Sequence, residues 1–171
     1  MKNFTLLSLI ILCFISCSKE NSFEITDETR RLDPNAENCY TPVDLIAGQN
    51  YTAGIVSYQV SNGELIVTYL TTGGWEIDAT HLYVGSCDQI PTNRPGNPRV
   101  GQFPYKSTED AGTNEVVWNI PVSEFPDCGC IAAHAELNLD GTQEETGWAA
   151  GEQLPGNSWA MFFDYCVSDC L

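Results

Sequence analysis

Residues 54–69 read GIVSYQVSNGELIVTY, and this stretch decides the fold class. Val56, Tyr58 and Val60 lie at alternate positions before the Asn62–Gly63 pair, and Leu65, Val67 and Tyr69 lie at alternate positions after it. Such alternation is typical of a half-buried strand, and an Asn-Gly pair between two alternating runs favours a two-residue hairpin turn. The stretch therefore predicts an antiparallel β-hairpin.

Further short alternating segments follow this hairpin along the chain. They cover residues 75–77, 80–84, 115–120, 131–137 and 159–165. Turn residues separate these segments, and no segment after residue 38 shows a convincing 3.6-residue period. We therefore expect an all-β domain over residues 39–171, an antiparallel β-sandwich (Ig-like or jelly-roll-like) of about seven to eight strands.

The charge of the chain limits its partners. Its 171 residues include 23 acidic and 7 basic side chains, for a net charge of −16, and 17 of the acids but only 3 of the basic residues lie after residue 38. This acidity repels phosphate backbones and anionic lipid headgroups, so we expect no nucleic-acid partner and no electrostatic membrane binding. A hydrophobic fraction of 43% is too high for a disordered acidic chain.

The N-terminus has the layout of an export signal. Lys2 precedes an apolar run over residues 4–15, which is too short to span a bilayer, and a small residue precedes Cys17. The sequence Phe14-Ile15-Ser16-Cys17 resembles the lipobox of bacterial lipoproteins, which implies a signal peptide over residues 1–16 and acylation of the Cys17 thiol. An ordinary cleaved signal with an incidental cysteine is the alternative.

Residues 17–38 are expected to form the lipidated cysteine and a flexible tether. The segment is polar, is interrupted by Pro34 and lacks a sustained helical period, although a helical stalk remains the alternative. Acyl chains on Cys17 would anchor the protein to a membrane without help from its own surface. We expect a lipid-anchored protein of the cell envelope, in the outer membrane.

Six cysteines remain once Cys13 and Cys17 are assigned to the signal and the lipid, and an even number outside the cytoplasm favours three disulfides. We expect Cys87 to bond to one member of the Cys128/Cys130 pair, because these residues adjoin the ends of two predicted strands. Cys39 should bond to Cys166 or Cys170, since they flank the domain. A zinc site made by the last four cysteines is the alternative. The six cysteines expected to form disulfides are Cys39, Cys87, Cys128, Cys130, Cys166 and Cys170.

The two histidines of the chain lie within predicted strands. His81 lies on the face opposite Leu82, and His134 shares a strand face with Glu136. If the two strands are neighbours, His81, His134 and Glu136 could bind a divalent metal; hydrogen-bonded structural histidines are the alternative.

No catalytic set is visible in the sequence. No serine has a Gly-x-Ser-x-Gly context, and no glycine-rich phosphate loop precedes a helix. The acid pairs Glu76/Asp78 and Glu144/Glu145 are interpreted as solvated surface. The sequence therefore favours a noncatalytic protein over an enzyme, and no cofactor is expected.

A ligand site is expected in the loops. Trp75 and Trp148 each follow a glycine in a turn-rich segment, where an indole ring can face a sugar or a peptide; a tryptophan that caps the end of the sandwich is the alternative. The proline-rich segment 86–106 contains all three cations of the domain, and an ordered loop of that length often binds a ligand. A structural loop that covers a sheet edge is the alternative. The expected ligand contacts are Trp75, Trp148, Arg94, Arg99 and Tyr105.

Several motifs occur in order along the domain. They are LIAGQ (45–49), GGW (73–75), THLYVG (80–85), GNP (96–98), GQFPY (101–105), IAAHA (131–135) and SWAMFF (158–163). With them, residues 45–165 resemble an uncharacterised family of secreted β-rich domains common in lipoproteins of the Bacteroidota. The resemblance implies the fold and the compartment and brings no activity.

The sequence as a whole predicts a noncatalytic cell-envelope lipoprotein. Its β-sandwich would bind a glycan or an envelope protein, or have a structural role at the surface. The alternative is a metal-assisted hydrolase that uses His81, His134 and a nearby acid.

Overall fold

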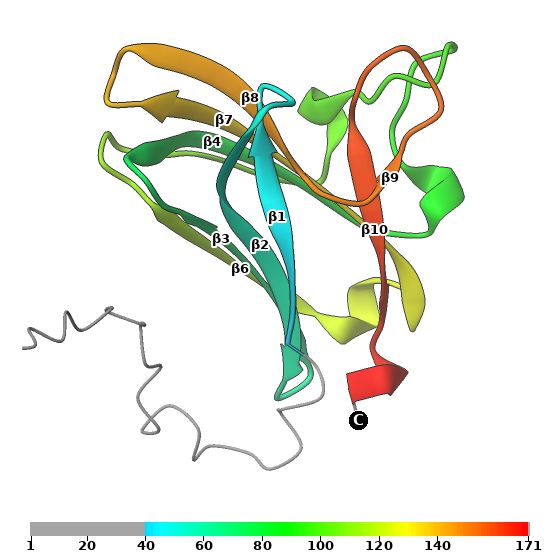
Figure 1. Cartoon of the computed structure of the whole chain (residues 1–171). Helices are drawn as coiled ribbons and strands as arrows, with labels where there is room; N and C mark the ends of the chain where they lie inside the picture. The colour runs from blue at the N-terminus through cyan, green and yellow to red at the C-terminus, as the bar shows by residue number, and fades with distance from the viewer. Residues whose placement is uncertain (1–39, 171) are drawn as a thin grey trace, which may run out of the picture. The chain divides into compact units, whose positions relative to one another are not determined.

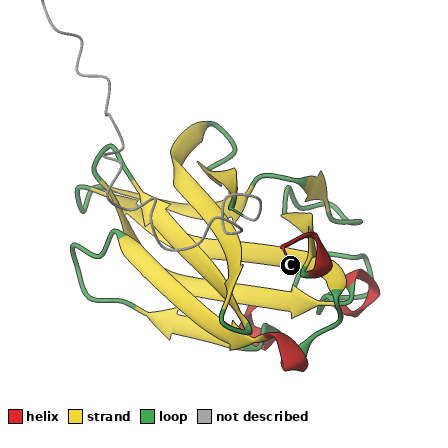
Figure 2. Ribbon diagram, turned by 90° about the horizontal axis from the view of Figure 1, so that it is seen from below, coloured by secondary structure: helices red, strands yellow, loops and turns green. Residues whose placement is uncertain are grey.

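The computed structural model describes residues 40–170. The expected signal peptide, the tether and Cys39 lie outside this range. Within it the chain forms antiparallel strands joined by loops and short 3-10 helices (Figures 1 and 2). No helix of the described residues is long and apolar enough to span a membrane.

The strands and 3-10 helices have the following bounds. The strands are β1 (Thr41–Ala47), β2 (Tyr51–Ser61), β3 (Glu64–Thr71), β4 (Trp75–Gly85), β5 (Tyr105–Thr108), β6 (Glu115–Pro121), β7 (Cys128–Leu139), β8 (Gln143–Ala149), β9 (Glu152–Gln153) and β10 (Met161–Cys166). The 3-10 helices are η3 (Cys87–Gln89), η4 (Val100–Gln102), η5 (Val122–Glu124) and η6 (Ser168–Cys170).

Eight strands form one continuous antiparallel sheet in the order β5-β4-β7-β8-β1-β2-β3-β6, and β10 pairs with both β7 and β9. The sheet curls so that the β4-β7-β8 half faces the β1-β2-β3-β6 half (Figure 1). At the open side, Trp118 of β6 donates a hydrogen bond from Nε1 to Thr80 Oγ1 of β4 at 3.2 Å. The all-β antiparallel prediction is therefore confirmed, with one curled sheet providing both layers.

The β2–β3 hairpin forms at the predicted turn. Asn62 and Gly63 have φ angles of 53° and 79°, and Ser61 pairs directly with Glu64. Positive φ at both central residues is the signature of a type I′ turn, which matches the twist of the strands on either side. Burial then alternates residue by residue along β3, as expected for a strand with one buried face.

The two faces of the β4-β7 pair contribute to different apolar clusters. Their inner faces supply residues such as Leu82 and Ile131 to the main core between the two halves of the sheet. Their outer faces supply Tyr83 and Ala132 to a second cluster with Phe103 and other loop residues. Apolar clusters therefore cover both faces of this part of the sheet. The second cluster holds the neighbouring outward-pointing side chains in place.

A bulge in β4 changes which residues of the strand face outward. The register against β7 shifts between Ile77 and Ala79, so two predicted short strands are one bulged strand. Ile77 lies in the main core before the bulge, whereas Leu82 lies there after it. A bulge adds one residue to a strand and so reverses the alternation beyond it. His81 consequently faces outward, on the side opposite Leu82.

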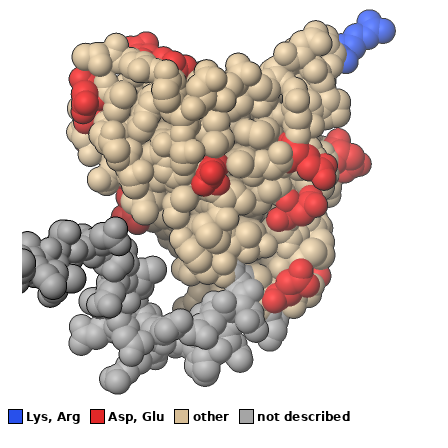
Figure 3. Space-filling view, in the orientation of Figure 1, with Lys and Arg blue, Asp and Glu red and all other residues tan. Residues whose placement is uncertain are grey.

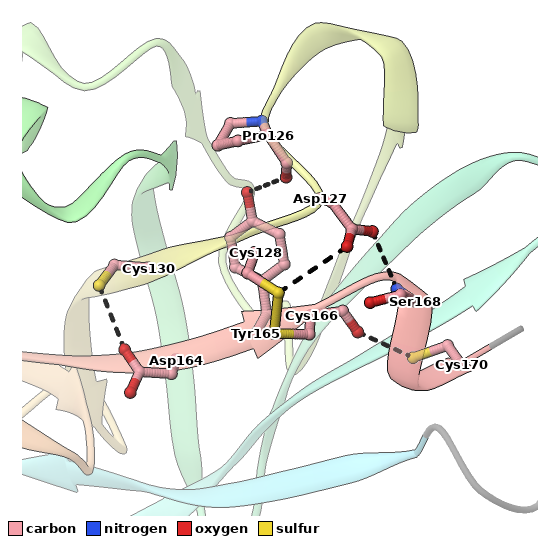
Figure 4. Close-up of a disulfide and its surroundings, with 9 residues drawn as sticks. All are labelled: Pro126, Asp127, Cys128, Cys130, Asp164, Tyr165, Cys166, Ser168 and Cys170. Atoms are coloured by element: carbon pink, nitrogen blue, oxygen red, sulfur yellow. Dashed lines mark hydrogen bonds between the residues drawn. A yellow bond between two sulfur atoms is a disulfide. The ribbon is translucent and has the colours of Figure 1, made fainter.

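Two disulfides connect the described elements. Cys87 bonds to Cys130, as predicted for Cys87 and one member of the Cys128/Cys130 pair, and Cys128 bonds to Cys166. The latter two residues are direct partners in the β7–β10 pair (Figure 4). The Cys39–Cys166 alternative and the four-thiolate zinc site are therefore wrong, because these thiols are already oxidised in other pairs. Cys170 is disulfide-bonded as well, and its predicted pairing with Cys39 stays a prediction.

Candidate functional site

A row of four side chains crosses the outer face of the sheet, one from each neighbouring strand. Lys106 of β5 is the register partner of His81 on β4, His81 is the partner of His134 on β7, and His134 is the partner of Trp148 on β8. Direct partners in adjacent antiparallel strands have side chains on the same face, close enough to touch. The prediction that the two histidine strands are neighbours is confirmed.

The two imidazole rings contact each other through the same type of nitrogen. Nδ1 of His134 lies 3.4 Å from Nδ1 of His81, and the ring centroids are 5.4 Å apart. One of these nitrogens must donate its proton and the other must accept it, so the two rings are different tautomers. On its other side His134 packs against the indole of Trp148, with a centroid distance of 4.8 Å.

The surroundings keep both rings uncharged at neutral pH. His134 is only 5% exposed, and its burial, with a smaller contribution from His81, lowers its pKa from 6.5 to about 3. Partial burial lowers the pKa of His81 as well, although the negative charge of Glu136 opposes that shift. Neutral imidazole is the form that can accept a hydrogen bond or bind a metal.

Two adjoining hollows open on this face, and Glu136 lines both. The first, of about 470 Å³, is lined by Asp78, Glu136, Leu137, Glu144, Glu145 and Thr146. The second, of about 330 Å³, is lined by Ala79, His81, Lys106, Ser107, Thr108 and Glu136. Asp78 accepts a hydrogen bond from Asn138 Nδ2 at 2.6 Å, and the Lys106 ammonium donates to the carbonyl of Gly101 at 2.9 Å. We call the first the acidic hollow and the second the histidine hollow.

The predicted metal triad is only partly assembled. In residues 40–170 the group whose ligand atoms all lie within 4.8 Å of one another is Cys87, Cys130 and Asp164, and its two cysteines form a disulfide. His81 and His134 are in contact, but Glu136 does not converge with them to that distance. The two histidines therefore contact each other, and the Glu136 carboxylate would have to turn toward them to complete the triad.

The expected exposure of two tryptophans is wrong. Trp75 is 7% exposed and Trp148 is 5% exposed. Trp75 belongs to the main core, whereas Trp148 belongs to the outer cluster and packs against Phe103 at a centroid distance of 6.4 Å. The glycine before each of them reflects tight approach of the chain, and neither ring presents a face to a ligand.

The proline-rich loop between β4 and β5 packs on the outer face of the sheet. Residues 91–99 form a small hairpin in which Asn93 and Asn97 bond to each other, and Oδ1 of Asn97 accepts the backbone N–H groups of Asn157 and Ser158. Phe103 and Ile90 from this loop complete the outer cluster. The loop covers a sheet face, which corrects the expectation that a structural loop would cover a sheet edge.

The remaining predicted ligand residues are dispersed. Arg94 and Arg99 are exposed. On the face shown in Figure 3, acidic side chains are spread over the surface and basic ones are confined to one corner. Tyr105 is half-buried on β5, where its hydroxyl donates to Glu124 at 3.1 Å and its ring contacts Trp118. The structure does not bring these three residues together with Trp75 and Trp148 into one site.

Sequence reasoning missed the convergence of acidic side chains at the acidic hollow. It treated Glu76/Asp78 and Glu144/Glu145 as separate solvated pairs, although Asp78, Glu136, Glu144 and Glu145 line the same hollow. The register of β4 against β7 and of β7 against β8 brings them together. Register between distant strands leaves no local signal in a sequence.

The fold and this surface define a disulfide-bonded, acidic antiparallel β-domain. Comparison with protein-family models, with curated proteins and with solved structures finds no match for this chain. The resemblance to secreted β-rich domains of Bacteroidota lipoproteins therefore stays a prediction.

Proposed function

We propose that the protein is a noncatalytic, lipid-anchored component of the cell envelope whose β-domain binds a basic segment of a protein or peptide at the acidic hollow. The oxidised cysteines support the compartment, because disulfides persist outside the reducing cytoplasm. Cys17, the expected lipid site, supplies the anchor.

Three carboxylate side chains around one hollow, those of Asp78, Glu136 and Glu144, determine the choice of ligand. Glu145 also borders the hollow, but it is the register partner of the core residue Leu137, and its carboxylate accepts a hydrogen bond from Gln143 Nε2. A domain with a net charge of −14 from residue 39 onward attracts cationic partners, and opposite charges speed their encounter. Anionic glycans would be repelled from this face. A neutral glycan would need an exposed aromatic platform, and the two tryptophans suggested for that role are buried.

The experiment compares the effect on binding of removing three negative charges at the acidic hollow with the effect of removing three elsewhere on the surface. The purified mature protein is tested by calorimetry against a lysine-rich peptide, a neutral peptide of equal length and a panel of neutral glycans. The test variant carries Asp78→Asn, Glu136→Gln and Glu144→Gln. The matched control carries Glu115→Gln, Glu152→Gln and Asp169→Asn, three exposed acids that do not line the hollow.

We expect the lysine-rich peptide to bind, with an affinity that falls as salt rises, and we expect the hollow variant alone to lose most of that binding. Equal loss in both variants would mean that only net charge matters and would overturn the proposed site. Binding of a glycan that survives in the hollow variant would place ligand recognition on another surface.

A further inference from the structure

The contact between His81 and His134 is fixed by the backbone of the sheet. Their strands are paired without interruption from Ala79–Glu136 to Gly85–Cys130, and the two histidines are direct partners in the middle of this stretch. Trp148 lies against one side of His134. The relative position of the two rings is therefore set by the fold, which is the condition for a preorganised ligand pair.

We propose that His81 and His134 are two ligands of a tetrahedral Zn²⁺ site, with Glu136 as the third ligand and a water as the fourth. This site goes beyond the proposed function, which requires no metal. It also differs from the four-thiolate site that the disulfides exclude, since it uses only nitrogen and oxygen ligands.

The distance between the two nitrogens selects the kind of metal. Zn–N bonds of about 2.0–2.1 Å that meet at a tetrahedral angle place the ligand nitrogens about 3.3–3.4 Å apart. The two Nδ1 atoms lie 3.4 Å apart. Neighbouring ligands in square-planar or octahedral geometry would lie closer, at about 2.9 Å, and Mg²⁺ and Ca²⁺ prefer oxygen ligands. The separation of the two nitrogens therefore suits Zn²⁺, and the rings would turn about their side-chain bonds so that both Nδ1 lone pairs point at the ion.

Glu136 is the acid best placed to complete the site. It is two residues from His134 on the same strand, so both side chains point to the same face, and it lines the histidine hollow together with His81. Its side chain has three rotatable bonds, by which the carboxylate can turn toward the histidines. The nearby cation Lys106 is engaged by the carbonyl of Gly101.

Metal binding would change the tautomer of one ring, which breaks its N–H bond at Nδ1 and forms one at Nε2, and would leave its carbon–nitrogen framework unchanged. In the structure the Nδ1–H of one ring donates a hydrogen bond to Nδ1 of the other. Zn²⁺ takes a lone pair from both Nδ1 atoms, so both rings must then carry their proton on Nε2, and the donor ring passes its Nδ1 proton to solvent as it gains one on Nε2. The histidine hollow opens beside His81 and Glu136 and gives the ion access to these two side chains.

Cobalt absorption tests the proposal, because tetrahedral Co²⁺ has strong visible bands that octahedral Co²⁺ lacks. The mature protein, with its disulfides intact, is titrated with Co²⁺ and then with Zn²⁺. We expect the tetrahedral bands to saturate at one equivalent of Co²⁺ and to vanish as Zn²⁺ displaces it. The variants are His81→Gln, Glu136→Gln and, as a matched control, Glu144→Gln, which removes a nearby acid that lines only the acidic hollow.

We expect His81→Gln to weaken Zn²⁺ binding by on the order of a hundredfold, Glu136→Gln by about tenfold and Glu144→Gln by less than about twofold. His81 is the histidine chosen because its ring is only half-buried, so its replacement should leave the fold intact, which circular dichroism checks.

Absence of the tetrahedral bands, or unchanged affinity in His81→Gln, would overturn the site. Unchanged affinity in Glu136→Gln would overturn the third ligand, and equal loss in Glu144→Gln would show nonspecific binding to the acids. Peptide binding is measured separately, so the proposed function and the metal site can fail independently.

Discussion

At the scale of single residues, His134 should make the stability of the domain depend on pH. Its pKa lies at about 3 in the folded chain and at its ordinary value of 6.5 once unfolded. Between these values the unfolded chain binds a proton that the folded chain does not, so the free energy of unfolding falls as pH falls, by about 1.4 kcal/mol per pH unit. The titratable groups that face it are its neighbour His81 and, beyond His81, Glu136 and Lys106.

Urea unfolding between about pH 7 and pH 5, in buffer with a metal chelator, measures this dependence. The His134→Gln variant is the control, because it lacks the titrating group and its stability should depend less steeply on pH in this range. Parallel curves for the two proteins would contradict the assignment of the buried, neutral state to His134.

Gly63 is the second residue with a predictable energetic role. Its φ of 79° is a conformation that an L-residue adopts at a cost, while a Cβ at this position would meet no atom within 4 Å. We expect Gly63→Ala to destabilise the domain by about 1–2 kcal/mol through the backbone alone. Gly101→Ala is the matched control, because Gly101 also has open space for a Cβ and has no positive φ. Thermal unfolding of both variants checks this, and an equal effect of the two would contradict the turn argument.

At the scale of elements, the Cys87–Cys130 disulfide ties the proline-rich loop to the sheet. The bond spans a sequence separation of 43 residues, for which the chain-entropy model gives a stabilisation of about 4 kcal/mol. We expect the Cys87→Ala/Cys130→Ala variant to lose up to that amount in urea unfolding and to expose the loop to proteolysis. Protease cleavage within residues 86–104 is the specific readout, and a Cys128→Ala/Cys166→Ala variant, which breaks a bond of similar span, is the control. Equal cleavage of that loop in both variants would contradict a local role for Cys87–Cys130.

The elements that the sequence predicts are those with a local cause. The β2–β3 hairpin follows from the Asn62–Gly63 turn, and β10 follows from an alternating aromatic run. β8, with the sequence QEETGWA, has no apolar alternation, and its position between β7 and β1 comes from pairing with distant residues. The short strand β5 lies at the end of a proline-rich segment and is defined by its pairing with β4.

The candidate site likewise combines features that the local sequence predicts with features that depend on long-range pairing. The alternation around His81 and His134 correctly predicts that both face away from the core, because side-chain direction is a local property of a strand. Their contact, the approach of Asp78 and Glu144 to Glu136 and the burial of Trp148 depend on strand register and on which loop covers the outer face. These are long-range properties, and the turn-rich sequence around Trp148 gives no sign of the loop that covers it.

At the scale of the whole molecule, the curled sheet places the main core and the proposed binding surface on different faces. The main core lies inside the curl, and the outer cluster under the proline-rich loop stabilises one part of the outer face. The part left open carries the acidic hollow and the histidine hollow. Residues on this open part can be exchanged without disturbing the main core, which makes the variants proposed above informative about binding.

The anchor is the prediction that belongs to the complete chain. The lipobox-like sequence that ends at Cys17 predicts acylation there, and the acyl chains would hold the acidic domain at a membrane that its own charge does not favour. We expect labelled palmitate to enter the wild-type protein in its native host and to be absent from the Cys17→Ser variant. The Cys13→Ser variant is the matched control, since it removes a cysteine within the expected signal peptide and should leave labelling intact. Labelling that persists in Cys17→Ser would refute the lipobox assignment, and the ordinary cleaved signal would then account for the N-terminus.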